Sequence, residues 1–229
     1  MLGVFAAGSV LLNGITKLDV ESAQAERVVL EGVKEDTVIW NERSSEIVEK
    51  EMDEKFQSTV EWALSSFLKC SPARTAVLLT TQSSNANQRW IPLAMAGILP
   101  SDPQLRSMIP DEVKGTPILD RMLREDDSIK GGTVGGTEVV GASKRSRRGP
   151  KESYLPTLQA LPGKVEFTYL PANAQEALIL PVTRHDGNAE NNKGWYYAVV
   201  LGGDTAKSFA PRDIAWCKEI ASWIGELVP

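Results

Sequence analysis

Two nearly uninterrupted apolar runs near the carboxyl end constrain the fold of this chain most strongly. They are residues 177–182 (ALILPV) and 195–201 (WYYAVVL). A strand with one face in water alternates apolar and polar residues, whereas a continuous apolar run is typical of a strand covered on both faces. We therefore expect these runs to be central strands of a sheet. The polar segment between them, RHDGNAENNKG, is typical of an exposed loop joining antiparallel strands.

Other segments predict further strands. Residues 75–81 (TAVLLTT) and 89–98 (RWIPLAMAGI) are separated by a polar SSNANQ turn, which predicts a hairpin. Residues 164–170 (KVEFTYL) alternate apolar and polar side chains and are expected to form another strand. The short segments 27–30 and 37–40 are expected to pair as a separate ribbon before the first helix.

Two long helices are predicted, one near the N-terminal end of the domain and one at its C-terminal end. The first spans residues 45–69, begins at a Ser44 or Ser45 cap and ends before Pro72. The second spans 211–228, with Pro211 in its first turn and Ser208 as a candidate cap. The expected buried side of the first helix is Ile47, Met52, Phe56, Val60, Ala63, Leu64 and Phe67. That of the second is Ile214, Cys217, Ile220, Ala221, Ile224 and Leu227, which makes Cys217 a packed thiol.

This order of elements predicts an α+β fold, in which an antiparallel sheet is flanked by N- and C-terminal helices. The 229 residues divide into an apolar segment 1–18, a linker or short ribbon 19–43, and a domain 44–229 with a mobile insertion at about 126–156. Residues 1–16 carry no charge. Two interpretations of them stay open: a buried or loosely packed N-terminal helix, and the trailing end of a transmembrane helix.

The insertion is rich in glycine and then in basic residues. A short helix is predicted just before it, at 118–124. The basic cluster is Lys144, Arg145, Arg147, Arg148 and Lys151. It fits a solubilising loop or an interaction site for acidic lipid headgroups or an acidic partner. Because the net charge is −5 and no aromatic residue is interleaved with the cluster, we expect no nucleic-acid binding.

The sequence contains little that points to catalysis. Its single histidine, His185, stands beside Asp186 in the polar loop, without a nucleophile in a recognisable elbow. We therefore predict a surface histidine, no catalytic residue and no metal site. Asn173, in the YLPAN turn, is expected to bond its own backbone, and Trp195 to cap an edge of the core. Both are also candidate interface residues.

The last third of the chain resembles GAF domains, although it lacks the N-K-F-D-E signature of cyclic-nucleotide-binding members and a cysteine placed for bilin attachment. A second resemblance covers more of the chain. The segments LPGKVEFTYLPANAQEALILPV and GWYYAVVLGGDTAKSFAPRDIAWCKEIASWI resemble the plant and cyanobacterial family of cofactor-assembly factors of complex C.

That resemblance implies a factor for covalent haem attachment to the cytochrome b subunit of the b6f complex. The partners it implies are a paralogous assembly factor, in a heterodimer, and the apocytochrome b subunit. It further implies a GAF-like domain on the stromal side of the chloroplast thylakoid membrane, held by N-terminal transmembrane helices. We expect no tightly bound cofactor and only transient contact with haem. Two other function classes stay open: a small-ligand-binding GAF-like sensor, and a lyase using His185 and Asp186.

Overall fold

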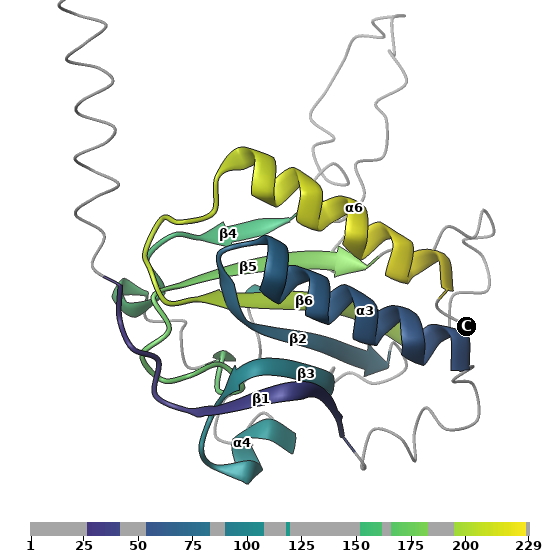
Figure 1. Ribbon diagram of the computed structural model, residues 1–229, viewed down its shortest axis with the longest axis horizontal. Helices are drawn as coiled ribbons and strands as arrows, with labels where there is room; N and C mark the ends of the chain where they lie inside the picture. Colours follow the sequence, from purple (N-terminus) through teal and green to yellow (C-terminus); the bar gives the residue numbers. More distant parts are fainter. Residues whose placement is uncertain are drawn as a thin grey trace, which may run out of the picture.

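The computed structural model describes residues 27–41, 54–82, 90–107, 118–119, 152–161, 166–182 and 195–227. In this part of the chain, six strands form one sheet in the order β1-β3-β2-β6-β5-β4 (Figure 1). The strands are β1 (Val33–Trp40), β2 (Ala73–Gln82), β3 (Ile91–Leu99), β4 (Ser153–Leu155), β5 (Glu176–Val182) and β6 (Trp195–Gly203). The helical elements are α3 (Glu54–Cys70), α4 (Pro103–Ser107), the 3-10 turn η1 (Leu158–Ala160) and α6 (Pro211–Leu227).

Every pair of neighbouring strands is antiparallel. Strands β2 and β6 lie at the centre of the sheet, where Val77 pairs with Val200 and Leu79 with Ala198. Strand β1 is one edge and the short β4 is the other. The predicted α+β class with an antiparallel sheet is therefore confirmed.

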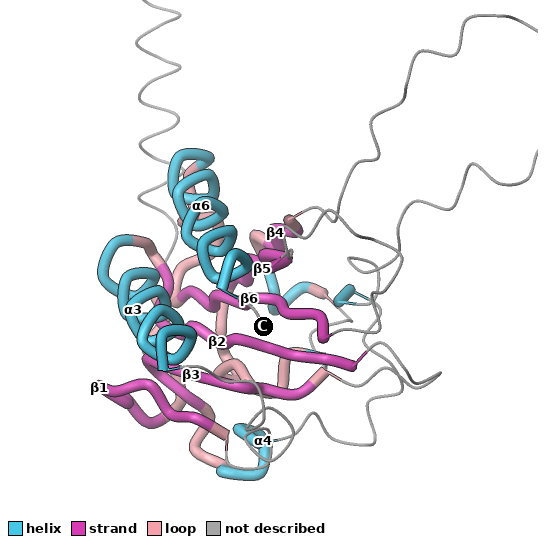
Figure 2. Tube along the Cα trace, turned by 90° about the vertical axis from the view of Figure 1, so that its right-hand side faces the viewer, coloured by secondary structure: helices cyan, strands magenta, loops and turns pink. Residues whose placement is uncertain are grey.

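Helices α3 and α6 cover one face of the sheet and run antiparallel to each other (Figures 1 and 2). The core between the helices and the sheet includes Phe67, Leu78 and Leu201, which are buried. Phe67 also meets Trp216 of α6 edge-on, with ring centroids 6.2 Å apart. The predicted apolar side of the first helix is confirmed over its described part, and Cys217 is buried in the same core.

The opposite face of the sheet is also covered, but by connecting segments instead of long helices (Figure 2). Val77, Ile179 and Val200 point to this side and pack with Phe167 and Tyr169 from the segment before β5. Alternate residues of β5 and β6 thus belong to two different cores. This two-sided burial explains why both strands are continuous apolar runs.

The structure corrects several expectations. Residues 166–170 form turns instead of a strand, and the Leu170 amide donates to the Phe167 carbonyl at 3.0 Å. Their alternation predicted one buried face that includes Phe167 and Tyr169, yet Glu166 and Leu170 are buried as well. Residues 153–155, which the predicted insertion included, form β4 along the edge of β5.

The ribbon expected from segments 27–30 and 37–40 is also absent from the described chain. Residues 27–30 belong to no strand, and β1 pairs with β3 as part of the main sheet. The expected start of the first helix at residue 45, most of the insertion and the apolar segment 1–18 lie outside the described residues. Among the helices that are described, none has the length and apolar character needed to cross a bilayer.

Candidate functional site

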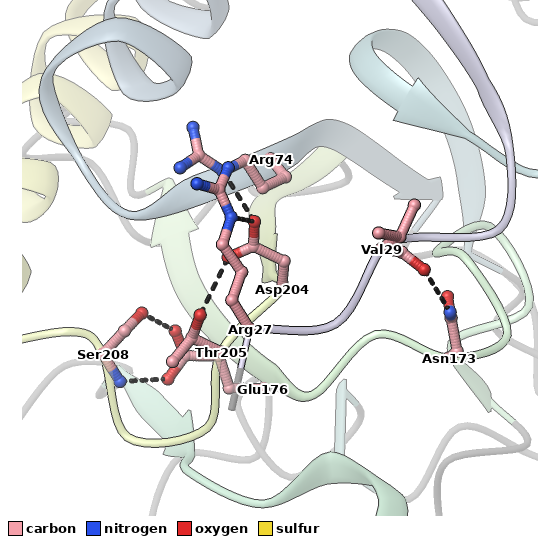
Figure 3. A network of polar contacts seen from close by, with 8 residues as sticks. All are labelled: Arg27, Val29, Arg74, Asn173, Glu176, Asp204, Thr205 and Ser208. Atoms are coloured by element: carbon pink, nitrogen blue, oxygen red, sulfur yellow. Dashed lines mark hydrogen bonds and ion pairs between the residues drawn. The ribbon is translucent and has the colours of Figure 1, made fainter. Parts of the chain in front are cut away.

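A polar network lies where the start of β2, the end of β6 and the segment 27–31 meet (Figure 3). Asp204 follows β6 directly and has a largely buried carboxylate. Its Oδ2 atom accepts hydrogen bonds from Nε of Arg27 at 2.8 Å and from Nε of Arg74 at 3.0 Å. Its Oδ1 atom accepts one from the Thr205 hydroxyl. The site therefore holds two guanidinium groups on one carboxylate.

The electrostatics of Asp204 follow from these contacts. Desolvation works to raise the pKa of the carboxyl group, but the hydrogen bonds from Arg27, Arg74 and Thr205 outweigh it, so the pKa lies below its ordinary value. Asp204 is accordingly ionised at neutral pH. Two positive charges and one negative charge leave the group with a net charge of +1.

The backbone of β2 directs Arg74 toward this site. Ala73 pairs with Gly203 and Thr75 with Gly202, so Arg74 is an extra residue in β2, a β-bulge that changes the direction of its side chain. Gly97 of β3 has a positive φ of 93°, and a Cβ there would lie 2.2 Å from the Arg74 carbonyl oxygen. Only glycine allows β3 to pass the bulge this closely.

Glu176, at the start of β5, is a second buried carboxylate in the same region (Figure 3). Its Oε2 atom accepts hydrogen bonds from the Tyr154 hydroxyl at 2.6 Å and the Ser208 amide at 2.9 Å, and its Oε1 accepts one from the Ser208 hydroxyl. Burial raises the pKa of Glu176, and the hydrogen bonds from Ser208 and Tyr154 lower it in part, with the net direction upward. The Ser208 hydroxyl therefore donates its hydrogen bond to Glu176. The expectation that Ser208 caps the second helix is corrected.

Asn173 holds the segment that carries Arg27. Its Oδ1 accepts a hydrogen bond from the Glu31 amide at 2.8 Å, and its Nδ2 donates to the Val29 carbonyl at 2.7 Å (Figure 3). The expectation that Asn173 bonds its own backbone is thus corrected, because its amide has both a donor and an acceptor directed at another segment. The Val28 amide adds a backbone bond to the Asp204 carbonyl.

On the helix face, Trp62 of α3 and Trp223 of α6 stack on each other. Their ring centroids are 5.7 Å apart and the ring planes differ by 21°. Their exposed fractions are 48% and 49%, and among the described residues the other large exposed apolar side chains are Val29 and Val33, which lie elsewhere. Neither tryptophan belongs to the apolar side predicted for its helix. We call Trp62 and Trp223 the tryptophan pair.

A pocket of about 390 Å³ opens on the side of the sheet that lacks the long helices. Apolar side chains such as Leu105, Phe167 and Leu170 line most of it, and Glu31 and Asp102 are the charged residues of the lining. Its volume falls within the usual range of small-molecule sites, roughly 300–1,000 Å³.

The described residues bring together few reactive groups. Burial raises the pKa of the Cys217 thiol to about 12, so this thiol stays protonated at neutral pH and is a poor nucleophile. Cys70 is exposed at the end of α3. Within the described ranges, no three His, Cys, Asp or Glu side chains are grouped as a metal site would require.

The predicted site residues are mostly untested. Lys144, Arg145, Arg147, Arg148 and Lys151, together with His185 and Asp186, lie outside the described residues. Trp195 begins β6, and its backbone pairs with Gln82. The Arg27–Arg74–Asp204 group and the tryptophan pair were not predicted, because each joins residues far apart in the sequence.

Over its described residues, the chain is an α+β domain. Its most distinctive features are the exposed tryptophan pair and the hydrogen bonds and ion pairs that join distant segments. The family model for cofactor assembly of complex C, CCB2/CCB4, matches residues 1–224, and the chain belongs to that family. A chloroplastic relative from Arabidopsis thaliana, the complex C cofactor-assembly protein CCB4, is 35% identical over 69 residues. The match covers 30% of this chain and 20% of that relative.

The structure also resembles solved proteins at low sequence identity. The type II free methionine-R-sulfoxide reductase from Thermoplasma acidophilum is 12% identical with a TM-score of 0.45, over 76% of this chain and 93% of that one. A GAF domain/HD domain protein from Geobacter sulfurreducens gives the same identity and TM-score, over 76% and 91%. The assignment of the fold class stands on the strand order of the chain itself.

Proposed function

We propose that this chain is a non-catalytic assembly factor for covalent haem attachment to the cytochrome b subunit of the b6f complex. Its family and the name of its chloroplastic relative support this proposal. In this proposal the domain faces the stroma at the thylakoid membrane and acts with a paralogous partner. Haem is handled transiently and is not a resident cofactor.

The observation that carries the proposal is the tryptophan pair. About half of each indole is exposed although the two rings already stack on each other. Tryptophan is enriched at the energetic centres of protein interfaces, because a large rigid ring buries much apolar area at little entropic cost. A scaffold is expected to combine a filled core with an exposed apolar patch that its partner covers.

The charges around the pair favour a protein partner over an anionic surface. The exposed charged residues of the two helices are close to balanced in sign: Glu54, Lys55, Glu61 and Lys69 on α3, and Arg212, Lys218, Glu219 and Glu226 on α6. A mixed rim of this kind suits the polar edge of a protein interface. We therefore propose that the paralogous factor docks on the α3–α6 face.

A docking role fits the chemistry of haem attachment. The reaction joins a cysteine thiol of the client to a haem vinyl group, and holding two reactants in place accelerates such a step substantially. Of the two cysteines, Cys217 is buried with a protonated thiol and Cys70 is exposed at the end of α3. In this proposal neither of them reacts with haem, and the reacting thiol belongs to the apocytochrome.

Co-purification tests the proposal. The affinity-tagged full chain is expressed with the paralogous factor and apocytochrome b, as wild type and as Trp62→Ala/Trp223→Ala. We expect both proteins to accompany the wild type and the double variant to retain less than about a tenth of the paralogue, since hot-spot truncations cost about 2 kcal/mol or more each. Val33→Ala, at an exposed apolar residue away from the helices, is the control and should retain it. Equal recovery with the double variant would refute docking on this face.

The pocket of about 390 Å³ favours a second candidate function, a small-ligand sensor. Ala172→Trp, at an exposed residue of the lining, places an indole at the pocket and distinguishes the two functions. If the chain is a scaffold, this variant supports haem attachment as well as the wild type does. If it is a sensor whose bound ligand controls haem attachment, attachment is lost although the thermal unfolding temperature is unchanged.

A further inference from the structure

The Arg27–Arg74–Asp204 group has more donors than acceptors. Both arginines use Nε to bind the same Asp204 Oδ2 atom, so their Nε atoms lie within the sum of the two distances, 5.8 Å, of each other. Among the described residues, no acceptor bonds the terminal Nη groups of either arginine. Figure 3 shows these Nη ends directed away from Asp204.

The exposure of the group leaves these donors accessible. The Arg27 side chain is 67% exposed and that of Arg74 is 37% exposed, whereas the Asp204 side chain is only 9% exposed. The buried carboxylate therefore anchors the two guanidinium groups from beneath, and their Nη edges face solvent. Like charges this close repel each other, and an anion bound between them would relieve that repulsion.

Several contacts hold the two arginines in place before any ligand arrives. Arg74 is fixed by the β-bulge opposite Gly203. Arg27 is fixed by the Val28 amide bond to Asp204 and by the two bonds from Asn173 to the segment that follows it. A site whose donors are already oriented loses less entropy when it binds.

We propose that Arg27 and Arg74 form a binding site for a phosphate group. A guanidinium group offers paired N–H donors in a planar fork that matches phosphate oxygens, and two adjacent forks match two oxygens of one phosphate. The net charge of +1 at the group is neutralised by the single negative charge of a phosphodiester or of a singly ionised phosphate. The phosphate comes from a soluble compound or from a lipid headgroup, and the test separates these sources. This site goes beyond the proposed docking function and does not depend on it.

The test is an NMR titration of the full ¹⁵N-labelled chain with inorganic phosphate, followed through the arginine Nε–H signals. The variants are Arg27→Gln and Arg74→Gln, with Lys55→Gln, an exposed residue of α3, as a matched loss of one positive charge. We expect saturable shifts in the wild type and in Lys55→Gln. Binding should be at least roughly tenfold weaker in each arginine variant, because each loses its charge-assisted hydrogen bonds to the phosphate oxygens. Arg27→Lys keeps the charge but loses the fork and should also weaken binding.

The source of the phosphate is read from a second arm, in which phosphatidylglycerol vesicles replace inorganic phosphate. Vesicle binding that is weakened in Arg27→Gln and not in Lys55→Gln identifies a lipid headgroup, whereas saturation by inorganic phosphate alone identifies a soluble compound. Far-UV circular dichroism confirms that each variant is folded, and Arg27→Lys, at the more exposed arginine, decides the outcome if Arg74→Gln unfolds. Absence of saturable binding in both arms, or equal weakening by Lys55→Gln, would overturn the proposal.

Discussion

Gly203 and Glu176 face each other across β6 and β5, and their contact gives a sharp prediction about the polar network. A Cβ on Gly203 would lie 2.5 Å from Glu176 Oε1 and 2.8 Å from its Cγ. Gly203→Ala must therefore displace the Glu176 side chain from Tyr154 and Ser208. Breaking hydrogen bonds to a buried carboxylate costs about 1.5–3 kcal/mol each, and partial relaxation leaves an expected loss of about 2–4 kcal/mol in the free energy of unfolding.

A double-mutant cycle separates this cause from a general intolerance of the strand. In a Glu176→Ala background the obstructing side chain is gone, and the two Cβ atoms would lie at an ordinary cross-strand distance of about 4.5–5.5 Å. Gly203→Ala should then be neutral or stabilise by about 0.5 kcal/mol, because alanine restricts the unfolded chain more than glycine does. Urea unfolding followed by circular dichroism measures all four proteins. An equal cost of Gly203→Ala in both backgrounds would show that Glu176 is not the cause.

Three further predictions concern other parts of the molecule. Because the pKa of Glu176 is raised in the folded chain, the wild type should lose stability relative to Glu176→Gln as pH rises from about 4 toward neutral. Urea unfolding of both proteins at several pH values measures this, and a difference in unfolding free energy that stayed constant with pH would contradict it. Asn173→Ala should lower the free energy of local unfolding of the segment that Asn173 holds by about 1–3 kcal/mol. The Glu31 amide loses its acceptor and should exchange hydrogen faster than in wild type. Cys70 should react with a thiol reagent in the native chain, whereas Cys217 should react only on unfolding; equal rates would contradict the packed thiol.

The sequence predicted those parts of the fold in which local pattern and burial agree. Residues 177–182 and 195–201 were predicted as central strands from their continuous apolar runs, and both faces of the sheet are indeed covered. The second helix was placed within one residue because Pro211 begins it. The hairpin of β2 and β3 followed from two apolar segments around a polar turn.

The errors have a common physical origin. The segment 166–170 has the alternation of a strand, but its backbone bonds itself because β4 already occupies the free edge of β5. The three residues of β4 are too few to give a periodic pattern. Ser208 and Asn173 were assigned to local bonds, whereas their true partners are 32 and up to 144 residues away along the chain. Contacts across such separations leave no local signal in a single sequence.

The most direct test of the central claim is haem attachment in cells that lack the endogenous factor and receive the full chain as wild type or as Trp62→Ala/Trp223→Ala. Covalent haem on the cytochrome b subunit is read as haem peroxidase activity in a denaturing gel. The docking account predicts that the wild type restores the signal and that the double variant does not, although it accumulates to the same level. Full restoration by the double variant would contradict the claim that the α3–α6 face serves assembly.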